Sequence, residues 1–132
     1  PFYRSVRIMR KQGILHSDLA ARINRLGHTD TWVIADCGLP VPPETPVIDL
    51  ALVFGTPTFR QVAEALLREV VVEAVTIAET TPRTVRELLP DVSLTEVSHE
   101  DLKEMLTDVS FVVRTGETTP YANAIFHSGV PF

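Results

Sequence analysis

The feature that most constrains the fold is an alternation, along the whole chain, between short apolar runs and amphipathic segments. Runs rich in Val, Ile, Thr and Phe predict strands, which lie at 32–35, 47–53, 71–78, 92–97, 110–114 and 121–126. Segments with apolar residues at helical spacing predict helices, which lie at 17–26, 59–70, 82–89 and 99–107. Such alternation is typical of α/β proteins. We therefore expect three αβα layers around a mostly parallel central sheet.

Small polar residues mark where helices begin. Ser17 is a suitable N-cap for the first helix, which Gly27 is expected to end. Ser98, followed three residues later by Asp101, predicts a capping box at the start of the last helix. The chain length of 132 residues suits one domain. We place it at 9–132, because Met9 resembles a natural start, and interpret residues 1–8 as a tag or an upstream extension.

Composition and charge exclude several classes of function. The net charge of −5 argues against a non-specific nucleic-acid binder, which needs a basic surface to neutralise phosphates. No apolar run approaches the ~20 residues needed to cross a bilayer, so no membrane partner is expected. The single cysteine, Cys37, cannot form a disulfide within the chain, which favours a reducing compartment. We expect a cytoplasmic protein.

Polar residues flank the predicted strand 32–35. His28 and Asp30 precede the strand, whereas Asp36 follows it, next to a Cys-Gly turn. In open parallel sheets, ligands bind beyond the carboxyl ends of strands, which makes Asp36 a candidate binding residue. His28 and Asp36 also have a purely structural interpretation. His28 follows a helix-ending glycine and suits a C-cap partner, and Asp36 before Gly38 suits an Asx turn.

Two further pairs of polar residues have informative spacings. His99 and Lys103 are four apart on one predicted helix and share a face; the helix dipole disfavours the imidazolium form of His99 at its N-terminus. Tyr121 and Asn123 are two apart in a predicted extended segment, so their side chains point to one side of the sheet. An amide and a phenol suit a sugar's hydroxyls and C–H surface. The alternative for His99 and Lys103 is a solvated helix face. For residues 115–119, which precede Tyr121, the alternative is an ordinary loop.

Metal binding is possible by residue type alone. His28, Asp30, Asp36 and His99 carry suitable donor atoms, but no HxH or CxxC spacing supports a site. The spacing therefore does not favour a metal site.

Six motifs together resemble a known family: "GILHSDLA", "LGHTD", "VIADCGLPVP", "IDLAL", "SHEDLK" and "RTGETTPYANAI". In order and spacing they resemble the ribose pyranase/fucose mutarotase family, and "GLPVP" is more similar to its ribose branch. The resemblance runs from Met9 to Phe132. It implies a small cytoplasmic mutarotase that interconverts the pyranose and furanose forms of D-ribose without metal or cofactor.

The resemblance also implies roles for particular residues. His28 matches the family's catalytic histidine, usually described as the proton donor. The sugar-contacting residues of the family match Asp36, His99, Lys103, Tyr121 and Asn123. The family builds its site between neighbouring subunits of homo-oligomers, typically decamers of two pentameric rings.

Ring interconversion needs proton transfer at two oxygens, which two acid/base groups can supply. His28 is the first candidate, with Asp36 orienting its imidazole or binding a sugar hydroxyl, and His99 is the second candidate. The main alternative is a non-catalytic sugar-binding or regulatory partner of a ribose uptake system, which would have no need of two titratable imidazoles. An aldose–ketose isomerase is a further alternative; it would need a carboxylate base or a metal for C–H abstraction.

Overall fold

The computed structural model describes residues 9–132, so the interpretation of residues 1–8 lies outside the described part of the chain. Helices and strands alternate along the described chain, as the apolar pattern predicts. The helices are α1 (Ser17–Asn24), α2 (Phe59–Leu67), α3 (Arg83–Arg86) and α4 (His99–Met105). The strands are β1 (Thr31–Ala35), β2 (Val47–Asp49), β3 (Val72–Ala78), β4 (Ser93–Val97), β5 (Phe111–Arg114) and β6 (Ala124–Ser128).

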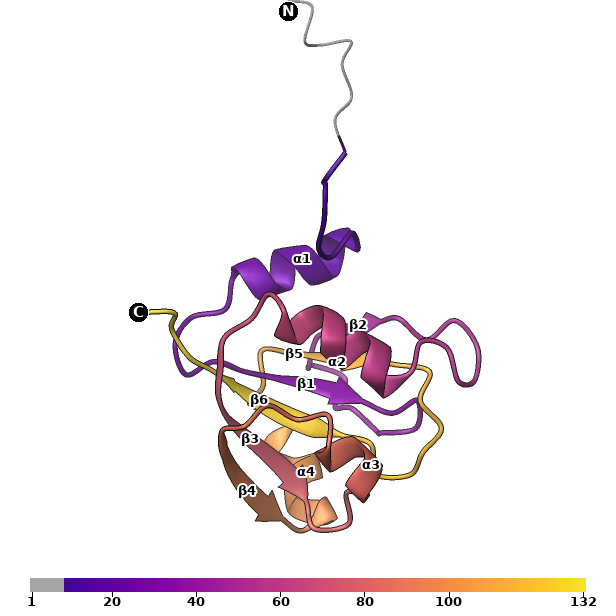
Figure 1. The fold of residues 1–132 in the computed structure, drawn as a ribbon. Helices are drawn as coiled ribbons and strands as arrows, with labels where there is room; N and C mark the ends of the chain where they lie inside the picture. The colour runs from indigo at the N-terminus through magenta and orange to yellow at the C-terminus, as the bar shows by residue number, and fades with distance from the viewer. Residues whose placement is uncertain (1–8) are drawn as a thin grey trace, which may run out of the picture.

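All of these strands form one six-stranded sheet in the order β2-β5-β1-β6-β3-β4. The pairs β1–β5, β2–β5 and β3–β4 are parallel. Strand β6 runs antiparallel to both of its neighbours, β1 and β3, in the middle of the sheet (Figure 1). The expectation of a mostly parallel sheet is therefore confirmed, with β6 as the reversed strand.

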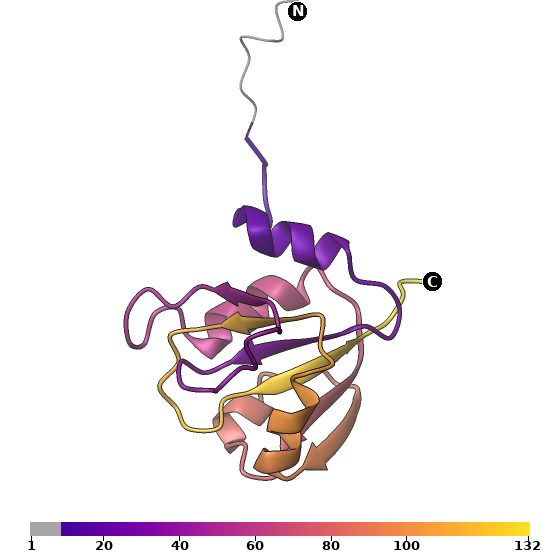
Figure 2. The ribbon, with the colours of Figure 1, turned by 180° about the vertical axis from the view of Figure 1, so that it is seen from behind.

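Alternating side chains of β1 separate the core into two halves. Trp32 and Ile34 pack in a cluster with apolar residues of α1, α2 and α3. Val33 and Ala35 point to the opposite face, where they pack with Leu102 and Leu106 of the α4 segment. Helices thus cover both faces of the sheet, as Figures 1 and 2 show from opposite sides, and the three αβα layers are confirmed.

An aromatic stack crosses the three central strands. Trp32 lies opposite Phe111 of β5 and opposite Phe126 of β6 in the strand registers. Its ring centroid lies 4.5 Å from that of Phe126 and 6.2 Å from that of Phe111, and both pairs are stacked. All three side chains are fully buried. Cross-strand aromatic pairs of this kind stabilise one particular register.

Several predicted boundaries are wrong. The N-cap of α1 is His16, whose Nδ1 accepts a hydrogen bond from the Leu19 N–H at 3.2 Å, so Ser17 is the first helical residue. Helix α1 ends at Asn24 with Arg25 as the C-cap, before Gly27. The predicted strand 47–53 ends at Asp49, whose carboxylate accepts from the Ala51 N–H at 3.0 Å and turns the chain away. In contrast, Ser98 is the N-cap of α4, as predicted.

Sheet topology brings distant polar segments to one edge. The carboxyl ends of parallel strands β1, β5 and β4 face the same way, and the antiparallel strand β6 begins at that edge. The segments that follow β1 and β4, and the connection between β5 and β6, therefore meet there. Binding residues are expected at such an edge.

Gly116 holds the β5–β6 connection close to the loop after β2. Its N–H donates to the Pro57 carbonyl at 2.8 Å, and a Cβ at this position would overlap the carbonyl oxygens of Thr56 and Val53, the latter at 2.6 Å. We expect Gly116→Ala to lower the free energy of unfolding by about 2 kcal/mol or more, because backbone must move. Urea denaturation measures the change. Gly38→Ala is the control, since its nearest contact would be an ordinary 3.8 Å; equal losses in both variants would contradict the prediction.

Candidate functional site

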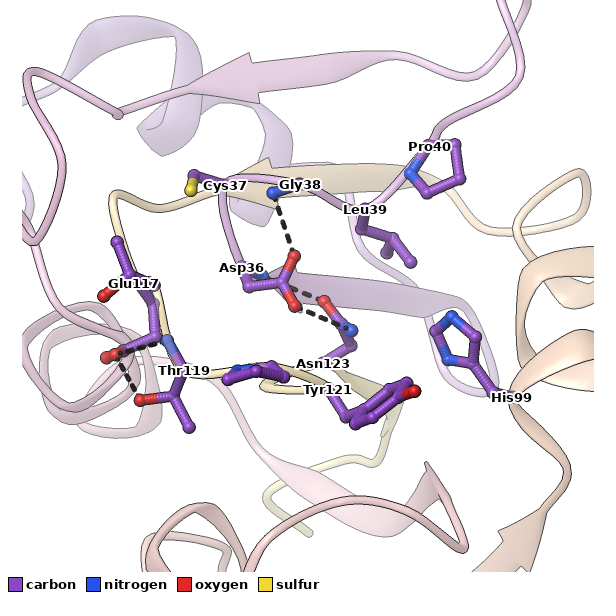
Figure 3. Close-up of a pocket in the computed structure, with 12 residues that line it drawn as sticks. Asp36, Cys37, Gly38, Leu39, Pro40, His99, Glu117, Thr119, Tyr121 and Asn123 are labelled. Carbon is purple, nitrogen blue, oxygen red and sulfur yellow. Dashed lines mark hydrogen bonds between the residues drawn. The ribbon is translucent and has the colours of Figure 1, made fainter.

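A cavity of about 320 Å³ lies at this polar edge of the sheet. Its walls come from three parts of the chain, which Figure 3 shows converging. They are residues 36–40 after β1, His99 at the start of α4, and residues 117–121 with Asn123 between β5 and β6. The volume lies at the lower end of the range for small-molecule sites. Four sequence-predicted site residues line this cavity: Asp36, His99, Tyr121 and Asn123.

Asp36 and Asn123 form the polar floor of the cavity. The Asp36 N–H donates to Asn123 Oδ1 at 2.9 Å, and Asn123 Nδ2 donates to Asp36 Oδ2 at 3.3 Å (Figure 3). The other carboxylate oxygen, Oδ1, accepts from the Gly38 N–H at 3.0 Å. The Asx-turn interpretation of Asp36 is therefore correct, and the same residue also lines the cavity. Each carboxylate oxygen retains a lone pair for a ligand hydroxyl.

Tyr121 and His99 form one wall of the cavity. Their rings meet edge to face, with centroids 5.0 Å apart and planes at 78°. His99 Nδ1 is buried and has no hydrogen-bond partner within residues 9–132, so it retains an unused donor or acceptor. The prediction that Tyr121 is extended is wrong: its φ of 61° is left-handed, and β6 begins only at Ala124. This turn, rather than strand alternation, brings Tyr121 to the cavity.

Glu117 holds the wall opposite His99 and was missed by the sequence analysis. Its Oε1 accepts from the Phe59 N–H at the start of α2, at 2.9 Å. Its Oε2 accepts from Thr119 Oγ1 at 2.8 Å and from the Thr119 N–H at 3.2 Å. Burial acts to raise the pKa of the carboxyl, but these donors, with the Thr118 N–H, hold the pKa below its ordinary 4.5. The segment 115–119, for which an ordinary loop was the alternative, is thus fixed by one carboxylate.

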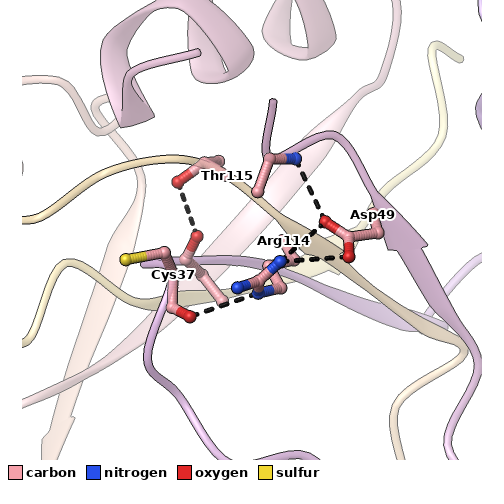
Figure 4. A network of polar contacts seen from close by, with 6 residues as sticks. Cys37, Asp49, Arg114 and Thr115 are labelled. Carbon is pink, nitrogen blue, oxygen red and sulfur yellow. Dashed lines mark hydrogen bonds and ion pairs between the residues drawn. The ribbon is translucent and has the colours of Figure 1, made fainter. Parts of the chain in front are cut away.

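Arg114, the last residue of β5, braces the loop after β1 from behind the cavity. Its Nε donates to the Cys37 carbonyl at 3.1 Å, and its Nη1 contacts both carboxylate oxygens of Asp49 at 3.1 and 3.0 Å (Figure 4). The buried Thr115 hydroxyl donates to the Ala35 carbonyl at 2.7 Å. The Cys37 backbone is therefore held from both sides, because its N–H also donates to the Glu117 carbonyl.

His28 lies at the other end of β1 from Asp36. The strand between them has five residues, which span about 16 Å at the usual rise per residue. His28 Nε2 lies 3.1 Å from Glu73 Oε2, and the histidine side chain is 51% exposed. The C-cap interpretation of His28 is wrong, because Arg25 caps α1. Within one chain, His28 does not join the cavity residues, and Asp36 does not orient its ring: the ring contacts Glu73, whereas the Asp36 carboxylate contacts Gly38 and Asn123.

Lys103 also lies outside the cavity lining. Its Nζ pairs with Glu100 Oε1 at 3.0 Å on the surface of α4. Within residues 9–132, no group of three or more His, Cys, Asp or Glu side chains is placed to hold a metal ion. In the same part of the chain, no helix has the length and apolar character required to cross a membrane.

The comparisons with known proteins match the whole described domain. The model of the RbsD / FucU transport protein family matches residues 9–131. A D-ribose pyranase of Corynebacterium glutamicum strain R is 59% identical over 124 residues, which cover 94% of this chain and 100% of that protein. A D-ribose pyranase of Cutibacterium acnes is 57% identical over 129 residues, with the same coverage.

A solved structure is similar throughout as well. The structure of Bacillus subtilis RbsD complexed with D-ribose aligns with a TM-score of 0.88 at 43% identity, over 94% of this chain and 100% of that one. The chain therefore belongs to the RbsD / FucU transport protein family. The resemblance that the sequence motifs indicate is confirmed.

Glu117 makes stability depend on pH in one direction. Its folded-state pKa lies below the unfolded value of 4.5, so its contribution is fully present above that value and is lost as pH falls through the folded pKa. Glu117→Gln should therefore destabilise the protein at pH 7 and have a smaller effect near pH 3. Thermal unfolding at both pH values measures this difference. Glu64→Gln on the exposed face of α2 is the control, and an effect of Glu117→Gln that grows toward low pH would contradict the prediction.

Proposed function

We propose that this protein is a mutarotase that interconverts the pyranose and furanose forms of D-ribose. The observation that carries the proposal is 59% identity over nearly the full chain to a protein named D-ribose pyranase. A structural relative was solved in complex with D-ribose. The cavity at the sheet edge offers acceptors and donors for hydroxyls, with an aromatic wall for the sugar's C–H surface.

The reaction requires only proton transfers. A base removes the proton of the anomeric hydroxyl while an acid protonates the ring oxygen, so the bond between the anomeric carbon and the ring oxygen breaks and the free aldehyde forms. The open chain rotates, and a different hydroxyl attacks the carbonyl carbon to close the five-membered ring. General acid and base groups each contribute roughly 10²–10⁴-fold to such steps. No metal or cofactor takes part in the proposed reaction.

The cavity residues have distinct proposed roles. The Asp36 carboxylate binds sugar hydroxyls through the lone pairs that Gly38 and Asn123 leave unused. Asn123, only 2% exposed, holds that carboxylate in place. Tyr121, which is 41% exposed, supplies a ring surface. The buried, unpartnered Nδ1 makes His99 the acid/base candidate within the cavity.

His28 is proposed to complete the site from a second copy of the chain. The two ends of β1 are too far apart for His28 and Asp36 of one chain to contact the same monosaccharide. A neighbouring copy that presents its exposed His28 to the cavity would place a second acid/base group on the sugar. We therefore propose a homo-oligomer, and the family resemblance favours a decamer of two stacked pentameric rings.

The remaining expectations belong to the same proposal. Lys103 would reach the sugar only by leaving Glu100, with which it pairs at the surface of α4. The free thiol of Cys37 suits a reducing, cytoplasmic location.

Exchange NMR on the anomeric protons of D-ribose tests the activity. We expect the protein to accelerate exchange between pyranose and furanose signals, with no ribulose formed. Line broadening without faster exchange would favour a non-catalytic sugar-binding protein, and accumulation of ribulose would favour an aldose–ketose isomerase. Either result would overturn the proposal.

Mixing two inactive variants tests the shared site. His28→Ala and Asp36→Ala should each lose activity about 100-fold or more, because each removes one side of the site. Co-expressed in equal amounts, they should recover about one quarter of wild-type activity, since that fraction of interfaces receives an intact residue from each copy. Recovery of no activity in mixed oligomers would show that both residues act within one chain. The separately purified variants, mixed without exchange of subunits, are the control.

A further inference from the structure

Glu73 is a carboxylate that the fold brings to the ring of His28, at the end of the sheet opposite the cavity. We propose that Glu73 is a positioning residue for His28: it accepts a hydrogen bond from Nε2–H and leaves Nδ1 to exchange the proton with the sugar. This inference rests on the proposed function, because it assigns His28 a partner in the same reaction. Three independent features of the backbone support it.

The first feature is a bulge in β3 at Glu73 itself. Val72 pairs with Ser128 of β6 and Ala74 pairs with the adjacent His127, so Glu73 is the extra residue between two consecutive partners. A bulge leaves one residue without a partner and changes the direction of its side chain, and bulges are frequent beside active sites. Here the redirected side chain reaches His28, with Glu73 Oε2 at 3.1 Å from Nε2.

The second feature is the end of β6, which contacts both partner segments. The Gly129 N–H donates to the Val71 carbonyl at 3.0 Å, and a Cβ on Gly129 would lie 3.3 Å from Glu73 Cβ. One residue earlier, the Ser128 carbonyl accepts from the Thr29 N–H at 3.0 Å. Figure 1 shows the chain between α1 and β1 passing beside this end of β6. Ser128 and Gly129 thus hold both the turn that carries His28 and the start of β3, where the bulge lies.

The third feature is the turn that carries His28. The Gly27 N–H donates to Asp30 Oδ2 at 2.8 Å, and the Asp30 N–H donates to the Gly27 carbonyl at 3.2 Å. Thr29, directly after His28, has a φ of 74°. A β-branched residue rarely adopts this left-handed conformation, and such outliers persist where the surrounding contacts enforce them. The turn therefore closes around His28 through the Gly27–Asp30 hydrogen bonds and holds the next residue, Thr29, in a strained conformation.

The chemistry of the pair fixes the state of the ring. An ionised carboxylate only accepts hydrogen bonds, so the Nε2 that faces Glu73 must carry the proton in the neutral imidazole. Nδ1 is then the unprotonated nitrogen, able to take a proton and return it. The two side chains are 51% and 47% exposed, and ion pairs at such sites add little stability. The contact therefore acts by orienting the His28 ring and selecting its tautomer, as in other carboxylate–histidine pairs.

Kinetics of Glu73 variants test the inference. We expect Glu73→Ala to lower kcat for ring exchange about tenfold with KM changed by less than about twofold, because the ring loses its orientation while the cavity is intact. Glu73→Gln, which keeps an acceptor oxygen, should recover part of the loss. In a His28→Ala background, Glu73→Ala should change kcat by less than about twofold, since the residue acts only through His28. Glu64→Gln is the control: Glu64 is a similarly exposed glutamate, 52% exposed and paired with Arg60.

A ¹⁵N spectrum of the His28 ring separates this inference from the proposed activity. The wild-type protein should show the tautomer protonated at Nε2, and Glu73→Ala should shift the population toward the Nδ1 tautomer. Protonation at Nδ1 in the wild type, unchanged kcat in Glu73→Ala, or an equal loss in the His28→Ala background would each overturn the inference. A protein with no mutarotase activity would overturn both the proposed function and this role in it, whereas the spectrum would still show whether Glu73 selects the tautomer.

Discussion

The stack of Phe111, Trp32 and Phe126 across β5, β1 and β6 is the interaction on which the polar edge of the sheet depends. A slip of one residue would move every side chain of a strand to the opposite face, and burial on both faces makes that costly. A slip of two residues would preserve the faces but break the aromatic pairs and separate Asp36 from Asn123. The stack therefore fixes the register of the three strands, and this register places the residues beyond the strand ends, such as Asp36 and Asn123, beside one another.

The pattern of apolar residues predicted those features of the fold that depend on burial of side chains. The alternation of apolar runs predicted the three layers and the mostly parallel sheet. Asp36 was placed at the carboxyl end of a strand because residues 32–35 are a continuous apolar run, which agrees with the burial of β1 in the structure. Boundaries set by single hydrogen bonds were not predicted. His16 caps α1 in place of Ser17, and Asp49 ends β2 early, because each uses a side-chain acceptor that propensity does not register.

Site residues divide in the same way. Five residues were predicted to contact the sugar together. The structure brings Asp36, His99, Tyr121 and Asn123 to one cavity, although Tyr121 arrives by a left-handed turn. Lys103 stays outside the cavity, paired with Glu100. Glu117 has no signal of its own in the sequence beyond its position in "RTGETTPYAN", since its role depends on the start of α2, which lies 58 residues away in the chain. The contact between His28 and Glu73, 45 residues apart, was likewise beyond the reach of local spacing.

The burial of Trp32 also has an optical consequence. It is the only tryptophan in the chain, its side chain is 0% exposed, and it packs in the aromatic stack at the centre of the sheet. Its fluorescence in the native state therefore comes from one apolar environment, and exposure to water on unfolding shifts the emission to longer wavelength. Trp32 belongs to β1, the strand between His28 and Asp36. Its emission therefore reports, without a label, on the strand that separates the two proposed site residues.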